Sequence, residues 1–166
     1  DFSSGKEINL PRKHKNLHLK KTSILDDDLN KLIQDFKPNI TYHLAAQISV
    51  SASTKNPLND AKINILGSIN LLESIKTLIN HKFIYITSGG TVYGEPETLP
   101  AIESYPAMPL SQYGASKYSI ENYLKIYNRL YNIGYSILRL ANVYGPNQDP
   151  HGEAGVVAIF IKAILS

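Results

Sequence analysis

The sequence contains no cysteine in its 166 residues, which excludes a disulfide scaffold, a thiol nucleophile and a thiolate zinc site. It also lacks any run near the roughly 18 consecutive apolar residues that a membrane-spanning helix needs. The first residues, Asp1 to Gly5, form neither an initiator methionine nor a signal peptide. These absences fit a cytoplasmic protein that does not contact a membrane.

Strong charge of one sign is also absent, because 17 Lys and Arg residues stand against 14 Asp and Glu residues. With 43% hydrophobic residues, the composition is that of one globular domain. Only residues 1–21 are distinctly basic, either as an anion-binding patch or as a solvated loop. No aromatic residue interleaves this basic run, so we expect no nucleic-acid partner. The pair His14 and His18 has no third ligand nearby, so we expect no metal site.

Short apolar runs alternate with longer amphipathic segments along the chain. The runs at 40–44, 83–87 and 135–140 are typical of strands covered on both faces, and a weaker strand is expected at 17–19. Apolar residues at helical spacing predict helices in the segments between and after these runs, at 26–36, 57–79, 112–131 and 156–165. This alternation predicts an α/β fold with a doubly wound parallel sheet.

Two long loops, 88–112 and 141–155, follow the carboxyl ends of predicted strands. Ligands bind at this edge of an open α/β sheet, so we expect the functional residues there. Tyr113 and Lys117 lie four residues apart on one helix face. A neighbouring ammonium would lower the pKa of the phenol and make it a general base for an alcohol proton. The alternative is an ordinary helix-surface contact, since such pairs also arise by chance.

Three segments together carry a family resemblance: Ser88 to Gly94, the Tyr113 and Lys117 pair, and Leu138 to Pro146. In this order and spacing they resemble the extended short-chain dehydrogenase/reductases. Within that family the resemblance is closest to the nucleotide-sugar epimerases of the UDP-glucose 4-epimerase type, and the segment from Asn147 to Val157 strengthens it. The resemblance covers essentially the whole chain.

The resemblance implies an NAD-dependent reaction through a 4-keto sugar. Tyr113 would take the proton of the sugar 4-hydroxyl, hydride would pass to NAD, and the ketone would be reduced on its other face. Lys117 would hold the nicotinamide ribose and tune Tyr113, while Thr91 or Ser88 would bond the reacting oxygen.

The same resemblance implies the residues that bind the ligands. Asp1 would bond the adenosine ribose, Tyr144 would place the nicotinamide end, and Asn142 would reach the nucleotide-sugar substrate. A homodimer would form through the helices at 59–79 and 113–131. The remaining cofactor-binding residues would lie on the strand ends and the long helix: Ala45, Ala46, Gln47, Asn64 and Thr87.

The chain departs from the family pattern at several positions. Gly89 stands where the family has its catalytic Ser or Thr, so Thr91 or Ser88 must substitute. Gly90-Thr91 replaces the Asp-Glu pair of the dehydratase branch, which favours an epimerase over a dehydratase. Ser23-Ile24 replaces the Asp-Ile pair that usually bonds the adenine.

No first strand and no Gly-x-x-Gly-x-x-Gly loop precede Asp1, and the family's substrate lobe is mostly absent. We therefore expect residues 1–166 to form a partial NAD-binding Rossmann domain, about half of such an enzyme, that is inactive alone. One alternative is a non-catalytic Rossmann domain with a binding or regulatory role. Another is a different extended short-chain enzyme, such as a nucleotide-sugar dehydratase or decarboxylase or an L-threonine dehydrogenase.

Overall fold

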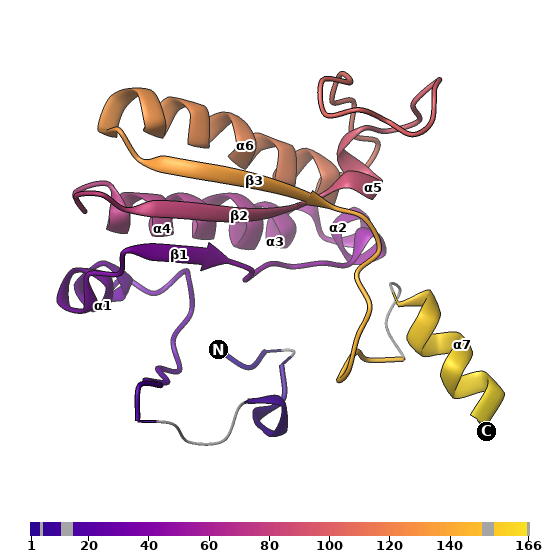
Figure 1. Ribbon diagram of the computed structural model, residues 1–166, viewed down its shortest axis with the longest axis horizontal. Helices are drawn as coiled ribbons and strands as arrows, with labels where there is room; N and C mark the ends of the chain where they lie inside the picture. Colours follow the sequence, from indigo (N-terminus) through magenta and orange to yellow (C-terminus); the bar gives the residue numbers. More distant parts are fainter. Residues whose placement is uncertain (4, 11–14, 151–154, 166) are drawn as a thin grey trace.

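The sheet organises the fold. The computed structural model describes residues 1–3, 5–10, 15–150 and 155–165. Three parallel strands, β1 (Ile40–His43), β2 (Lys82–Ser88) and β3 (Gly134–Leu140), lie in the order β1-β2-β3 (Figure 1). Ile40 lies opposite Lys82, and Lys82 lies opposite Gly134. The three apolar runs are thus confirmed as parallel strands, and the predicted Rossmann-like α/β class is confirmed with them.

The predicted strand at 17–19 is wrong. These residues have no regular structure, and Leu17 and Leu19 are exposed. A strand is stabilised by a ladder of backbone hydrogen bonds to a neighbour. Among the described residues, β1 pairs only with β2, and no strand pairs with residues 17–19. These residues therefore lack the backbone hydrogen bonds that would make them a strand.

The helices follow the predicted pattern with three differences, one of which is a short helix at Gly89–Val92 within the predicted loop 88–112. The predicted helix at 57–79 is three segments that end at Ile75, so Ile79 lies outside it and is exposed. A further short helix, α2, precedes them where none was expected. The bounds are α1 (Leu29–Phe36), α2 (Val50–Lys55), α3 (Pro57–Ala61), the π-helical turn η2 (Lys62–Leu66), α4 (Gly67–Ile75), α5 (Gly89–Val92), α6 (Gln112–Tyr131) and α7 (Val156–Leu165), with a 3₁₀ turn η1 at Glu7–Asn9.

Polar side chains fix where the helices near the sheet edge begin. The Ser49 hydroxyl accepts from the Ala52 N–H at 2.9 Å, and the Asn56 side chain accepts from the Asn59 N–H at 3.1 Å. The Ser111 hydroxyl accepts from the Gly114 N–H at 3.1 Å and caps α6. Each cap satisfies one of the free N–H groups that a helix start exposes.

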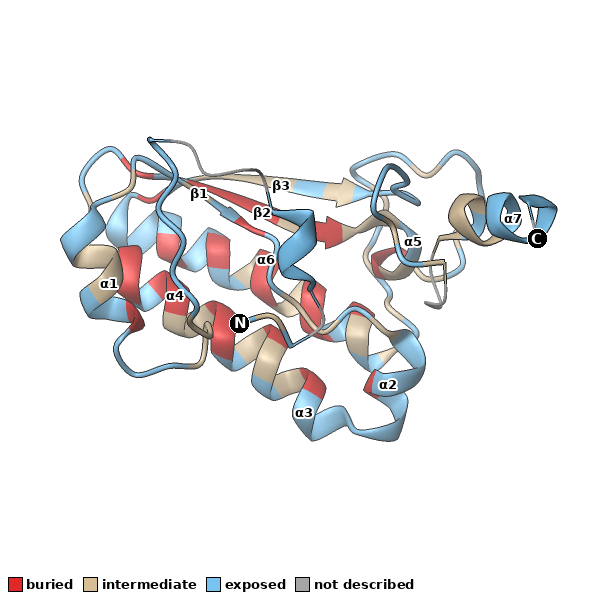
Figure 2. Cartoon of the chain, turned by 90° about the horizontal axis from the view of Figure 1, so that it is seen from below, coloured by how far each residue is buried: buried red, intermediate tan, exposed pale blue. Residues whose placement is uncertain are grey.

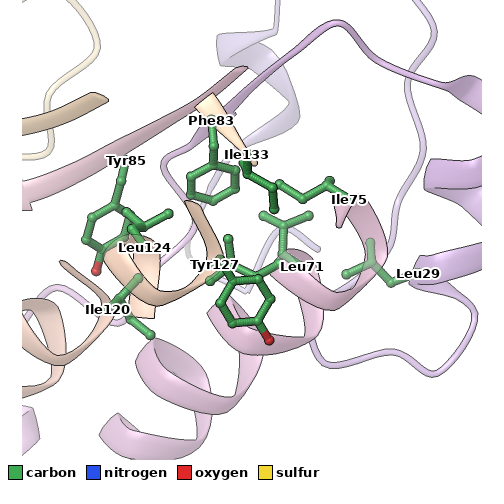
Figure 3. Packing of buried hydrophobic residues seen from close by; sticks show 10 residues of the cluster. Leu29, Leu71, Ile75, Phe83, Tyr85, Ile120, Leu124, Tyr127 and Ile133 are labelled. Carbon is green, nitrogen blue, oxygen red and sulfur yellow. The ribbon is translucent and has the colours of Figure 1, made fainter. Parts of the chain in front are cut away.

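The core lies between the sheet and the helices on one of its faces. Figure 2 shows buried residues of α4 and α6 turned towards the strands. Phe83 and Tyr85 of β2 are fully buried against Leu72 of α4 and against Ile120 and Leu124 of α6 (Figure 3). Burying one such side chain contributes about 1.5–3 kcal/mol before the entropy of ordering it is counted. This packing fixes α6, and with it the predicted site, against the sheet.

The other face of the sheet carries exposed apolar side chains. Ile40, Tyr42, Leu138 and Leu140 all point away from the α4 and α6 layer and are exposed. Parallel sheets usually bury both faces, but the described helices bury this sheet on one face. No described helix is both long and apolar enough to span a membrane.

Candidate functional site

The carboxyl ends of the strands and the start of α6 meet at one edge of the sheet. Ser88 ends β2 and is followed directly by α5, which carries Thr91. The first turn of α6 lies against α5: a Cβ added to Gly114 would be only 2.7 Å from the Thr91 carbonyl oxygen. This close approach needs a glycine, and it brings the elements that carry Thr91 and Tyr113 into direct contact.

Tyr113 and Lys117 lie on the first two turns of α6, as predicted. The Tyr113 N–H donates to the Ser53 hydroxyl at 3.1 Å, which joins α6 to α2. Lys117 is buried, and its Nζ lies 4.6 Å from the centre of the Tyr85 ring. The Tyr85 hydroxyl donates to the Lys117 carbonyl oxygen at 3.3 Å. The ammonium therefore sits over an aromatic face inside the protein, an arrangement that stabilises a cation.

The predicted lowering of the Tyr113 pKa is wrong for the chain without ligands. Burial raises the pKa of Tyr113, and the negative charge of Asp60 raises it further. Burial lowers the pKa of Lys117 to about 8, although Asp60 and Glu121 act in the opposite direction. The prediction counted only the neighbouring lysine, and omitted both desolvation and the carboxylate of Asp60 on another helix.

Two buried threonine hydroxyls near these residues have no partner. The Thr87 and Thr91 hydroxyl oxygens are buried without a hydrogen bond to any described residue. An unsatisfied buried hydroxyl costs about 1–3 kcal/mol. Such groups are expected where a ligand provides the missing partner, which fits the predicted roles of Thr87 and Thr91.

Gly89 has a structural reason to be glycine. A Cβ at this position would lie 3.1 Å from the Arg139 carbonyl oxygen and 3.4 Å from the Leu140 carbonyl oxygen. The backbone of β3 therefore crowds the position where a serine or threonine hydroxyl is usual in the resembled family. Ser88 is half-buried and its side chain does not cap α5, so both Ser88 and Thr91 are still candidates.

A buried polar network lies beneath the turn after β1, and its central residue, Asp60, was not among the predicted site residues. The Asp60 carboxylate accepts from the side chains of Gln47 at 2.8 Å, Asn64 at 2.9 Å and Ser116 at 2.6 Å. Asn64, predicted to support the cofactor site, also bonds both backbone groups of Gln47 at 2.9 Å. The only hint in the sequence is the spacing of Asp60 and Asn64, four residues apart on one helix face.

The predicted adenosine-side residues come together. A cavity of about 710 Å³ is lined by residues from the first segment, from 22–25 and from the turn after β1. Asp1 lies at this cavity with Ala45, Ala46 and Gln47, and apolar walls are provided by Ile24 and Ile63. An exposed carboxylate beside a mainly apolar hollow fits an adenosine, whose base is apolar on its faces and whose ribose donates hydrogen bonds.

The structure does not bring the two residues beyond β3 to this site. Tyr144 is exposed and lines a separate cavity of about 350 Å³ against Val157 and Ile161 of α7. Asn142 is exposed as well. No described residue of α7 is buried, so little packing holds the segment from 141 onwards against the sheet. The predicted positions of Tyr144 at the nicotinamide and Asn142 at the substrate therefore have no support from this arrangement.

A larger cavity, of about 760 Å³, lies beside the site between α6 and β3. Arg139 and Glu121 face it and form an ion pair, with the Arg139 Nη2 to Glu121 Oε2 distance at 2.6 Å. The guanidinium also lies 4.8 Å from the Tyr93 ring centre. Tyr113, Lys117 and Thr91 do not line this cavity. Among the described residues, which exclude His14, no group of three or more possible ligands could hold a metal ion.

Comparison with known proteins shows which family the chain matches. A family model described as GDP-mannose 4,6 dehydratase matches residues 3–166. The UDP-glucose 4-epimerase of Mycolicibacterium smegmatis is 45% identical, with 100% of this chain and 54% of that protein covered. The chain spans about half the length of the curated relatives it matches.

Solved structures agree in fold and sequence. The UDP-glucose 4-epimerase of Thermotoga maritima with UDP-glucose matches with a TM-score of 0.92 and 44% identity, over 99% of this chain and 53% of that one. The UDP-glucose 4-epimerase of Thermus thermophilus in complex with NAD matches with a TM-score of 0.90 and 40% identity, over 99% and 52%.

Proposed function

Since the chain belongs to the extended short-chain dehydrogenase/reductases, in the family described as GDP-mannose 4,6 dehydratase, we propose that the whole protein is an NAD-dependent nucleotide-sugar 4-epimerase. It would interconvert UDP-hexose C4 epimers through a 4-keto intermediate. One observation carries the proposal: Tyr113 and the buried Lys117 lie at the start of α6, against the short helix that holds the unpartnered Thr91 hydroxyl. A phenol, an ammonium and a hydroxyl are the groups that a proton transfer at a sugar alcohol requires.

NAD would supply the hydride acceptor for the sugar carbon. Asp1 would accept hydrogen bonds from the adenosine ribose at the rim of the 710 Å³ cavity, beside Ala45 and Ala46. Gln47 is held by Asn64 on both of its backbone groups, which fixes the turn that would face the cofactor. The unpartnered Thr87 hydroxyl would gain its missing hydrogen bond from the bound cofactor. Tyr144 and Asn142 are exposed beyond β3 and lie apart from these residues, so they carry no part of this proposal.

Tyr113 would take the proton from the sugar 4-hydroxyl as hydride leaves C4, and would return it to the ketone oxygen when hydride is added to the opposite face of C4. Its raised pKa keeps the phenol protonated in the chain without ligands. The phenolate therefore needs a neighbouring cation, which Lys117 supplies while it is protonated, below about pH 8. The same ammonium would hold the ribose hydroxyls of the nicotinamide end.

The hydroxyl that shares the reacting oxygen with Tyr113 would come from Thr91 or Ser88. Thr91 is favoured by its buried and unpartnered oxygen. Thr91→Val and Ser88→Ala in the full-length protein separate the two: the variant that loses turnover identifies the hydroxyl. Wild-type turnover in both variants would exclude this role for Thr91 and for Ser88.

The homodimer would form through the outer faces of the α3–α4 segment and α6. Three apolar side chains on these helices are exposed and point away from the sheet core: Leu66 on η2, and Ile126 and Leu130 on α6. Exposed apolar residues that gather on neighbouring helices favour association with a second copy.

Two other functions fit the fold less well. A dehydratase needs an acid and a base to eliminate water, and Gly90-Thr91 provides no carboxylate where the dehydratase branch has Asp-Glu. A non-catalytic binding or regulatory domain would be compatible with Gly89. A domain without catalysis would give no reason to bury the Lys117 ammonium beside a tyrosine at the carboxyl edge of the sheet.

A coupled epimerase assay on the full-length protein tests the proposal. Tyr113→Phe should lower turnover by about 10²–10⁴, the usual effect of removing a general base. Tyr118→Phe is the matched control, because Tyr118 is half-buried on the same helix and has no proposed role. Wild-type turnover in Tyr113→Phe would refute the assignment of the base, and no turnover in the wild type would refute the proposed function.

A further inference from the structure

Asp60 is a buried acid in the middle of the site region. It lies on α3, its side chain is only 1% exposed, and it accepts three hydrogen bonds. No lysine, arginine or histidine nitrogen of the described residues lies within 4.0 Å of its carboxylate. Burying a carboxylate without an ion pair is costly, so a role beyond packing is expected.

The three donors come from three different elements. Gln47 belongs to the turn after β1, Asn64 to the π-helical turn η2, and Ser116 to the second turn of α6. The Ser116 hydroxyl to Asp60 Oδ2 distance is 2.6 Å, a short and charge-assisted bond. Ser116 precedes Lys117 and follows Tyr113 by three residues. The carboxylate thus ties the cofactor-side turn directly to the helix that carries both proposed catalytic residues.

We propose that Asp60 is a positioning residue, which fixes the spacing between the turn at 44–49 and the start of α6 and sets the charge around Tyr113 and Lys117. The inference rests on the proposed function, because it assigns Asp60 to the same site. Asp60 acts through Gln47 and Ser116 and has no proposed contact with the substrate.

The electrostatic surroundings support the second part of the proposal. The Asp60 charge raises the pKa of Tyr113 and opposes the lowering of the Lys117 pKa by burial. The titratable groups that face this region are Lys117 and Glu121 on α6, Tyr85 on β2 and His43 on β1. Tyr85 and His43 are both uncharged at neutral pH, since burial raises the pKa of Tyr85 and lowers that of His43 to about 3. Asp60 therefore provides a fixed negative charge that keeps Lys117 protonated and holds the Tyr113 proton until substrate arrives.

Asp60→Asn separates charge from geometry. The amide has the same shape, and Ser116 can turn its hydroxyl from donor to acceptor, so all three hydrogen bonds can be kept. Without the charge, Tyr113 should ionise at a pH lower by about one unit, the usual size of one neighbouring charge. The ionisation is read from tyrosinate absorbance, as the difference between each full-length protein and the same protein with Tyr113→Phe. An unchanged ionisation pH would overturn the charge role.

Ser116→Ala tests the positioning role and does not depend on how Asp60→Asn folds. It removes one bond of the network, which should lower thermal stability, and it leaves the charge. At temperatures where the variant is folded, kcat should fall at least about tenfold through misplacement of the catalytic helix. Ser119→Ala is the control, because Ser119 bonds only the Ala115 carbonyl oxygen of its own helix. Equal kcat in the two variants would overturn the positioning role. If the wild type has no epimerase turnover, the proposed function fails, and the Tyr113 ionisation pH in Asp60→Asn still decides the inference.

Discussion

Replacement of Gly114 by alanine should disturb both the stability and the site of the protein. The new Cβ would lie 2.7 Å from the Thr91 carbonyl oxygen, 3.0 Å from Pro109 Cβ and 3.2 Å from the Ser111 hydroxyl. Two of these neighbours are held by backbone, so α6 must move away from α5. Overpacking of this kind typically costs about 1–3 kcal/mol, while the better helix propensity of alanine returns about 1 kcal/mol. We expect a net loss of up to about 2 kcal/mol in the free energy of unfolding.

Urea unfolding of Gly114→Ala and Gly134→Ala measures this cost against a matched control. Gly134 begins β3, and a Cβ there would meet only the His81 carbonyl oxygen at an ordinary 3.5 Å. Gly134→Ala should therefore be as stable as the wild type, or more stable by up to about 1 kcal/mol. In Gly114→Ala the shift of Tyr113 should also lower kcat, because a misplacement near 1 Å costs up to about 10²-fold. Equal stability of the two variants would refute the argument that α5 and α6 are in contact at Gly114.

Three further outcomes are expected from chemical denaturation. Burial lowers the pKa of His43 to about 3, so the unfolded state binds more protons between pH 6.5 and 3. Stability should therefore fall by about 2 kcal/mol from pH 7 to pH 5, a loss that His43→Asn abolishes. Arg139→Ala leaves the buried Glu121 without its partner and should cost about 3–5 kcal/mol, which Arg139→Lys does not fully restore because it lacks the fork of donors. Leu124→Ala opens a cavity and should cost about 2–5 kcal/mol, whereas Leu58→Ala at an exposed site stays within about 0.5 kcal/mol.

The helices and strands that were predicted well include those in which regularly spaced apolar residues are also buried in the core. The helix at 112–131 was predicted from apolar residues at helical spacing, of which Ile120, Leu124 and Tyr127 are buried in the core. The others at that spacing are exposed: Tyr123, Leu130 and Tyr131. The segment at 17–19 has strand-like residues but no pairing neighbour among the described residues, and pairing is a property of the fold. The long helix contains a π-helical turn at η2 but continues through it without a gap. The spacing of apolar residues in the sequence did not reveal this turn.

The place of the candidate site at the carboxyl edge of the sheet was predictable, because strand ends and helix starts meet there. The roles of Tyr113, Lys117, Thr91 and the turn after β1 come from the family resemblance and stay predictions. Asp60 was missed because a single acid in a short amphipathic helix looks like a solvated residue. Its burial depends on Ser116, which is far away in sequence. The direction of the Tyr113 pKa shift depends first on burial and then on the Asp60 charge, and neither could be obtained from the helix alone.

The parallel ladders have a consequence for how the chain acquires its structure during synthesis. Ile40 pairs with Lys82 and Lys82 with Gly134, so neither ladder can begin as a hairpin and each closes a loop of about 40 to 50 residues. A ribosome adds about 5–20 residues per second, so β1 waits about 2–8 seconds before β2 exists to receive it. During this interval Ile40 and Tyr42 cannot pair with β2, and the ladder between β1 and β2 forms only after α4 has been made.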